Sequence, residues 1–185
     1  MNGSLLFVSI FLFFLVMFIV VIYNRLVTLK NKAHNAISNI DVQLKKRYDL
    51  IPALVDSVKG YMTHEKALLK EITVLRSKAQ QRNLSDEENV DINNQLSSAL
   101  GKLLVNVEAY PDLKASDNFM HLQRSLAEVE EQLSASRRSF NMAVTKLNIS
   151  IESFPSNVIA SLFNFKKQSL FEATANERKT VEVDI

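Results

Sequence analysis

Cysteine and tryptophan are absent from the 185-residue chain, and glycine and proline occur only three times each. Without cysteine there can be no disulfide, thiolate metal site, cysteine nucleophile or lipid-modified cysteine. An all-β fold needs more turn-forming residues than three glycines and three prolines supply. The composition therefore predicts a single helical domain.

A long apolar run is the strongest feature of the N-terminal region. Residues 5–22 read LLFVSIFLFFLVMFIVVI, with Ser9 as their single polar residue. Twenty helical residues at about 1.5 Å each span roughly 30 Å, the thickness of a bilayer's hydrocarbon core. No basic residue precedes the run and no small-residue cleavage site follows it, so we expect a retained transmembrane helix within residues 1–23 and not a cleaved signal peptide.

Basic residues follow the apolar run. Residues 24–49 hold six Lys or Arg and two Asp, whereas the rest of the chain is slightly acidic. By the positive-inside rule, we expect the N-terminus to face outward and the chain after residue 23 to be cytoplasmic. The nearly neutral distal part does not support nucleic-acid binding. Four residues beside the run are expected to contact lipid: Tyr23, Arg25, Lys30 and Lys32.

Beyond the run, apolar residues recur in alternating steps of four and three from Ala33 to Ala79. Only Arg47 and Glu65 interrupt this coiled-coil-like stripe among 14 positions. A phase that persists this far predicts one helix over residues 24–81, continuous with the transmembrane helix.

Pro52 lies inside this predicted helix. An interior proline removes one backbone hydrogen bond, so a kink near Tyr48 is expected. Alternatively, Asp49 caps a new helix with Pro52 in its first turn, and the chain reverses there. Because the stripe keeps its phase across Pro52, we favour the kinked helix.

Two further long helices are predicted, over residues 86–109 and 116–154. Ser85 and Glu88 have the spacing of a capping box, Pro111 stops the first of these helices, and Ser116 can cap the second. Short connections return each helix alongside its predecessor. The expected fold is therefore all-α: an elongated antiparallel bundle over residues 24–154, with a short helix near 157–163 and a tail within 155–185.

Several motifs together resemble one family. The segments NIDVQLKKRYDLIPALVDSVKGY, YPDLKAS, RRSFN and FPSNVIASLF follow the apolar run in this order, and from about Tyr23 to Phe171 the chain resembles the bacterial LemA family. The resemblance implies a membrane protein with its N-terminus outside and a cytoplasmic helical bundle. One relative is linked to building magnetosome membranes, which implies membrane organisation or shaping. Ala53 and Phe140 depart from the asparagine and tyrosine usual in the family, and each change removes a hydrogen-bonding group.

No pattern of catalytic or metal-binding residues is found. His34, His64 and His121 lack the glutamate three residues earlier that a di-iron bundle needs, and Leu68 stands where HExxH requires its second histidine. Gly101-Lys102 lacks the partner glycine of a phosphate-binding loop, and no G-x-S-x-G elbow occurs. We therefore expect a protein that is not an enzyme and has no cofactor.

Arg47 lies on the apolar stripe, where an unpaired charge would be costly. It is expected to fix helix register by pairing with Asp49 on its own helix, or with Glu130 or Glu131 across the bundle. The alternative is an anion or lipid site formed with Lys45 and Lys46.

Two residues of the RRSFN motif, Arg137 and Asn141, occupy neighbouring turns of the last long helix. We hypothesise that Asn141 satisfies the backbone carbonyl that Pro52 leaves free.

Aromatic and basic residues gather near the C-terminal end. Phe163 and Phe165 precede Lys166 and Lys167, with Phe154 and Phe171 on either side. The interpretation we favour is that these phenylalanines cover the end of the bundle. The alternative is an aromatic and basic patch that docks on a membrane surface.

The predicted helix lengths suggest a function. A second helix of about 24 residues can cover only part of a first helix of about 58, which would leave an apolar stripe near the membrane, formed by Ala33, Ile37, Ile40 and Leu44. We therefore expect a homo-oligomeric scaffold that binds membrane lipids and organises or shapes the inner membrane. The alternative is a module that recruits a membrane protein partner, such as a protease or a signalling kinase.

Overall fold

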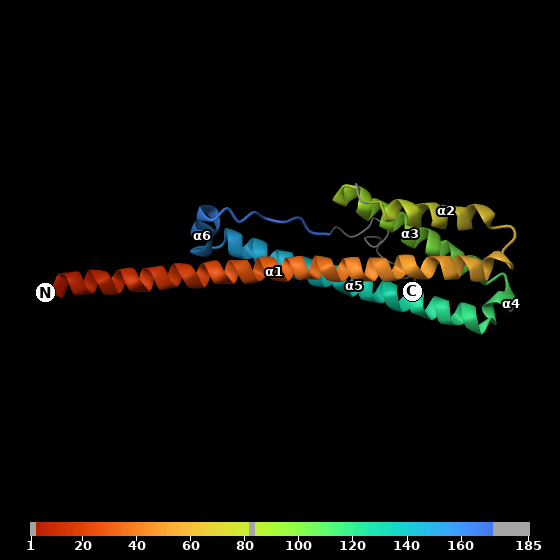
Figure 1. The fold of residues 1–185 in the computed structure, drawn as a ribbon, viewed down its shortest axis with the longest axis horizontal. Helices are drawn as coiled ribbons and strands as arrows, with labels where there is room; N and C mark the ends of the chain where they lie inside the picture. Colours follow the sequence, from red (N-terminus) through yellow and green to blue (C-terminus); the bar gives the residue numbers. More distant parts are fainter. Residues whose placement is uncertain (1–2, 82–83, 172–185) are drawn as a thin grey trace, which may run out of the picture. The chain divides into compact units, whose positions relative to one another are not determined.

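The computed structural model describes residues 3–81 and 84–171, and within these residues it contains helices and no strands (Figure 1). The predicted all-α fold is confirmed. The helices, in chain order, are α1 (Gly3–Lys59), α2 (Lys66–Ala79), α3 (Asp86–Val107), α4 (Pro111–Lys114), α5 (Asp117–Glu152) and α6 (Ser156–Leu162).

Helix α1 begins with the apolar run and is long and apolar enough to cross a membrane. Nearly all of the run's large side chains are exposed, including Phe7, Phe11 and Phe14. An exposed surface of this kind is stable against lipid and costly in water.

The predicted helix over residues 24–81 is two helices in the structure. Helix α1 continues through Pro52, so the alternative of a reversal at this proline is wrong, but the chain turns between Lys59 and Lys66. The backbone N–H of Met62 donates to the carbonyl of Val58 (2.9 Å), and the Met62 side chain is buried in the turn. The apolar residues of α2 happen to continue the alternating four- and three-residue spacing of α1. The pattern therefore crosses the six-residue turn without a visible break.

The turn also explains why Glu65 interrupts the stripe. Its carboxylate accepts a hydrogen bond from the Tyr110 hydroxyl (2.7 Å), which raises the pKa of Tyr110. Glu65 therefore links the turn before α2 to the connection between α3 and α4.

The remaining helices begin and end close to their predicted bounds. The Ser85 hydroxyl accepts a hydrogen bond from the Glu88 backbone N–H (3.2 Å), and the Glu88 carboxylate accepts one from the Ser85 N–H (2.9 Å), which confirms the capping box. Helix α5 starts one residue after Ser116, and α4 is a single turn that the sequence patterns did not predict. The tail beyond residue 171 lies outside the described residues.

The chain forms two compact units, and α1 and α5 contribute to both. The second unit, which contains the described residues of 42–133, holds the C-terminal part of α1 together with α2, α3, α4 and the first half of α5. Helices α2 and α3 pack against each other. Its core consists of aliphatic side chains from every one of these helices together with Phe119.

The first unit contains the described residues of 1–41 and 134–171. It combines the N-terminal part of α1 with the last part of α5, helix α6 and the segment that follows α6. Ile22 and Leu26 of α1 form an apolar cluster with Ile159 and Ala160 of α6, and three partly buried side chains pack against it: Ile19, Ile151 and Phe165.

The expected exposed stripe on the first helix is largely absent. Ala33, Ile40 and Leu44 are buried, and only Ile37 remains 38% exposed. The prediction counted the second helix as the only cover. In the structure the last part of α5 and the C-terminal segment also belong to the first unit, and Leu44 lies in the core of the second unit.

Candidate functional site

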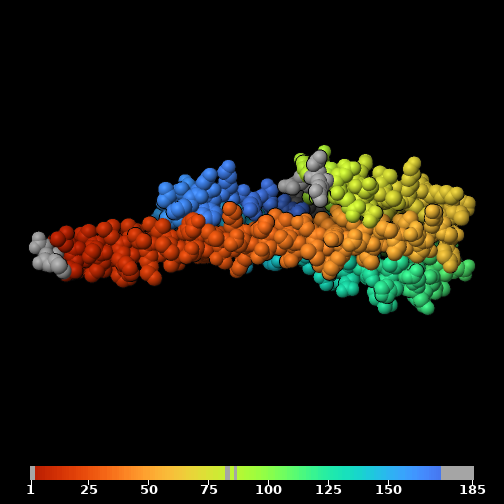
Figure 2. All heavy atoms as spheres, in the orientation of Figure 1, coloured from red at the N-terminus to blue at the C-terminus, as the bar shows by residue number. Residues whose placement is uncertain are grey.

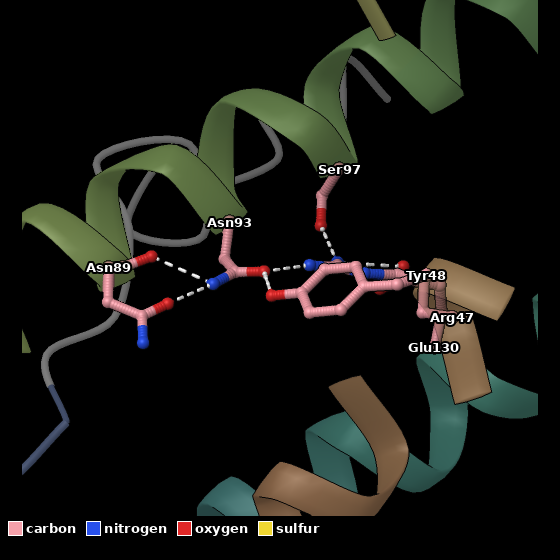
Figure 3. Close-up of polar contacts among 6 residues, drawn as sticks. All are labelled: Arg47, Tyr48, Asn89, Asn93, Ser97 and Glu130. Atoms are coloured by element: carbon pink, nitrogen blue, oxygen red, sulfur yellow. Dashed lines mark hydrogen bonds and ion pairs between the residues drawn. The ribbon is translucent and has the colours of Figure 1, made fainter. Parts of the chain in front are cut away.

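Arg47 is the centre of a buried polar network in the second unit (Figure 3). One terminal nitrogen of its guanidinium donates to the Ser97 hydroxyl of α3 (2.8 Å) and to Oε1 of Glu130 of α5 (3.0 Å). The other donates to Oδ1 of Asn93 of α3. Arg47 has no exposed surface, and its charge is neutralised by Glu130, one of the partners that the sequence predicted.

Asn93 extends the network along α3. Its side-chain oxygen also accepts a hydrogen bond from the Tyr48 hydroxyl (2.6 Å), and its amide nitrogen donates to the backbone carbonyl of Asn89 (2.8 Å). Arg47 and Tyr48 therefore meet the same oxygen of Asn93 (Figure 3). Sequence patterns did not indicate Asn93 or Ser97, because each stands among polar neighbours on α3.

The backbone carbonyl that Pro52 leaves without a partner accepts a hydrogen bond from a residue of α2. A helical proline has no N–H, so the carbonyl four residues earlier, that of Tyr48, loses its usual partner. The Nε–H of Arg76 donates to this carbonyl (2.7 Å). The hypothesis that Asn141 fills this role is wrong, because Asn141 lies in the first unit and binds the backbone of Phe171 instead.

The network connects α1, α3 and α5 through hydrogen bonds among its own side chains, which leave the buried Nε of Arg47 without a partner. Lys45, Lys46 and Asp49 lie exposed on α1, whereas Arg47 is buried. The proposed anion or lipid site of Lys45, Lys46 and Arg47 is therefore not assembled. The expectation that Asp49 pairs with Arg47 is also wrong, since the carboxylate on Arg47 is that of Glu130.

The residues near the end of the apolar run gather in the first unit. The Tyr23 ring lies 4.8 Å from that of Phe163 and 5.9 Å from that of Phe165, measured between ring centroids. Arg25, Lys30, Lys32 and Lys166 are exposed, and Lys167 forms an ion pair with Glu152 at the end of α5. The structure thus brings Tyr23 together with the C-terminal aromatics, although they stand 140 residues apart in the sequence.

Two asparagines of α5 hold the segment after α6. Asn141 accepts from the Phe171 N–H and donates to its carbonyl (both 2.9 Å), and Asn148 does the same for Gln168 (3.0 and 2.8 Å). The rings of Phe140 and Phe171 meet edge to face at 5.0 Å. Arg137 is half-buried one turn before Asn141. Asn148 was missed by the sequence analysis, although its seven-residue spacing from Asn141 was a usable signal.

In the described part of the chain, no three His, Asp or Glu side chains converge in a way that could hold a metal ion.

Comparison with known proteins shows the chain's family. The family model described as LemA family matches residues 36–185. Protein LemA of Metamycoplasma hominis is 32% identical over 161 residues, which cover 87% of this chain and 73% of that protein.

Shorter matches are found to magnetosome proteins. Magnetosome protein MamQ 2 of Paramagnetospirillum magneticum is 35% identical over 75 residues, and magnetosome protein MamQ of Magnetospirillum gryphiswaldense is 31% identical over 74. Each match covers 40% of this chain and less than a third of the relative. Together with the apolar helix, these similarities indicate a membrane-associated protein. By the extent of the family match and of the similarity to the Metamycoplasma protein, this chain belongs to the LemA family.

Proposed function

We propose that this protein is a non-enzymatic, membrane-anchored scaffold that self-associates and organises or shapes the bacterial inner membrane. Its N-terminus is outside and its helical bundle is cytoplasmic. The observation that carries the proposal is the continuity of α1, which contains both the apolar run and Arg47 without interruption. One helix therefore ties the anchor directly to the packed interior of the bundle.

The chemistry of the buried network supports a structural role. Arg47 connects α1 to α3 and α5, and Arg76 connects α2 to α1. Buried polar groups of this kind specify one arrangement of helices more than they add net stability. A scaffold needs one helix arrangement, because every copy must present the same surface to its neighbours.

Self-association requires a surface that the chain's own helices leave uncovered. The stripe expected to provide it has been reduced to Ile37, since Ala33, Ile40 and Leu44 are buried. Ile37 lies on α1 beyond the apolar run, and neighbouring copies anchored in one membrane would meet along this helix. The partial likeness to magnetosome proteins supports the membrane-organising part of the proposal.

Crosslinking in native membranes tests the proposal. The natural chain has no cysteine, so Ile37→Cys introduces a single thiol, and Lys59→Cys at the far end of α1 is the matched control. We expect oxidation to link Ile37→Cys into dimers much more readily than Lys59→Cys, and the protein in mild detergent to exceed the mass of one chain.

A strictly monomeric particle, with no crosslinking at residue 37, would overturn self-association. A stoichiometric complex with one foreign protein would instead favour the partner-recruiting function.

A further inference from the structure

Helix α6 has apolar side chains on two faces. One face, with Ile159 and Ala160, is buried against Ile22 and Leu26 of α1. The other exposes Val158 (57%) and Leu162 (71%), which are four residues apart, and Phe154, which precedes the helix, is 83% exposed. Helix α6 has no charged residue. Large apolar side chains in a row on an uncharged helix indicate a surface that is covered when the protein is in place.

The position of α6 shows which environment is adjacent. Its partner Ile22 is the last residue of the apolar run, and Leu26 lies one turn further along α1. In a bilayer crossed by residues 5–22, α6 therefore lies at the boundary between hydrocarbon and headgroups. Figure 2 shows the C-terminal residues drawn in blue protruding from one side of α1, beyond the N-terminal part of that helix.

Aromatic and basic residues also lie near this boundary between hydrocarbon and headgroups. The Tyr23 ring contacts that of Phe163, directly after α6, at an interplanar angle of 57°, and Arg25 and Lys166 are exposed nearby in the sequence. Aromatic rings with one polar end concentrate at membrane interfaces, and cations close to them meet anionic headgroups.

A hollow bounded by α1, the end of α5 and the turn before α6 has a mixed apolar and polar lining. Phe18 and Val21 of the run line it together with Arg25, Ser153 and Phe154. A mixed lining that includes a cation suits a phospholipid, which carries both acyl chains and a phosphate. A second protein would not require an apolar surface continuous with the lipid-facing side of the run.

We propose that α6, with Phe154 and Phe163, is an interfacial helix whose exposed face enters the cytoplasmic leaflet of the bilayer that α1 crosses. This inference rests on the membrane anchoring in the proposed function. Interfacial helices bury their apolar face about 5–10 Å into the boundary between headgroups and acyl chains. Insertion beside the span occupies area in one leaflet only, which gives each copy a means of bending the membrane.

Spin labels in the full-length protein, reconstituted into vesicles of phosphatidylethanolamine and phosphatidylglycerol, test this inference. Single cysteines replace Val158 or Leu162. Phe13→Cys in the run and Ser98→Cys, exposed on α3, are the lipid and water controls. Collisions with oxygen report lipid, and collisions with a water-soluble nickel chelate report water. We expect labels at 158 and 162 to favour oxygen, with depths between those of the two controls.

Each other outcome overturns the inference in a distinct way. If label 13 is in lipid but labels 158 and 162 collide with nickel as often as label 98, α6 is in water while the anchor stands. If labels 158 and 162 are shielded from both reagents, a protein covers α6. If label 13 itself reports water, the anchor and the interfacial helix fail together.

Discussion

The two units of the molecule hold the same two long helices by different means. In the second unit, Arg47 of α1 reaches Asn93 and Ser97 of α3 and Glu130 of α5 inside a largely aliphatic core. In the first unit, α1 and α6 form an apolar cluster, and hydrogen bonds hold Ser156 of α6 and the segment after α6 to α5. Directional bonds admit one helix register, whereas apolar contacts tolerate small shifts. The contacts of the second unit therefore favour one helix register. The first unit depends more on apolar contacts.

Removing Arg47 gives the largest expected effect. Arg47→Ala removes the buried cation from Glu130, whose side chain is 35% exposed, and leaves the buried Asn93 without this partner, at a cost of about 3 kcal/mol of unfolding free energy. Urea denaturation in mild detergent measures the loss, with the neighbouring exposed Lys46→Ala as control. An Arg47→Met, Glu130→Leu double variant should recover much of the stability, because it removes both charges. If Arg47→Ala behaves like Lys46→Ala, the network does not determine the second unit's stability.

The compensation of Pro52 by Arg76 is expected to have an intermediate effect. Arg76→Ala strands the buried carbonyl of Tyr48, at a cost of about 1–3 kcal/mol. In a Pro52→Ala background the new N–H can bond to that carbonyl, so the same substitution should cost less. A double-mutant cycle by urea denaturation measures this coupling. The exposed Lys78→Ala serves as control. Equal costs of Arg76→Ala in both backgrounds would contradict the assigned role.

In the first unit, the asparagine contacts should give a smaller and local effect. Asn148→Ala removes both hydrogen bonds to Gln168 and should speed amide exchange there roughly tenfold, as expected for about 1.4 kcal/mol of local opening. Exchange in α3 should be unchanged. Met142→Ala, at an exposed position of the same helix, is the control. Exchange at Gln168 that matches the control would show that packing alone holds the segment.

The capping box should give the smallest effect, visible as a pH dependence. Hydrogen bonds from the Ser85 backbone N–H and hydroxyl lower the pKa of Glu88 below its ordinary value of 4.5. The stabilisation is therefore fully present above pH 4.5 and is lost as the pH falls through the lowered pKa. The protection factors of the amides at the start of α3, which correct for the pH dependence of intrinsic exchange, should decrease over this range, and less so in Ser85→Ala. An identical pH profile in the variant would contradict the capping role.

How far the sequence predicted the structure depended on the range of each interaction. The capping box involves residues three apart, so Ser85 and Glu88 were sufficient to place the start of α3. Arg47 was recognised as buried by its place in the stripe, and charge complementarity limited its partners to three acidic residues. The polar partners Asn93 and Arg76 were not predictable, because nothing local distinguishes them from exposed residues of the same type.

The errors came from assuming too simple a path for the chain. Counting apolar positions cannot separate one helix from two whose phases agree, so the turn at Gly60 was missed. The cover over Ala33 and Ile40 was missed because it depends on where α5 ends and on the path of the segment that Asn141 and Asn148 hold. By contrast, the apolar run required no tertiary information, since its length and composition alone define a span.

The bond between Arg76 and Tyr48 has one more consequence. In an ordinary helix every interior carbonyl is occupied, so a neighbouring helix can slide by a full turn, about 5.4 Å, and meet an equivalent surface. Pro52 leaves the Tyr48 carbonyl without its intrahelical partner, and Arg76 of α2 donates to it. The bond therefore fixes the position of α2 along α1.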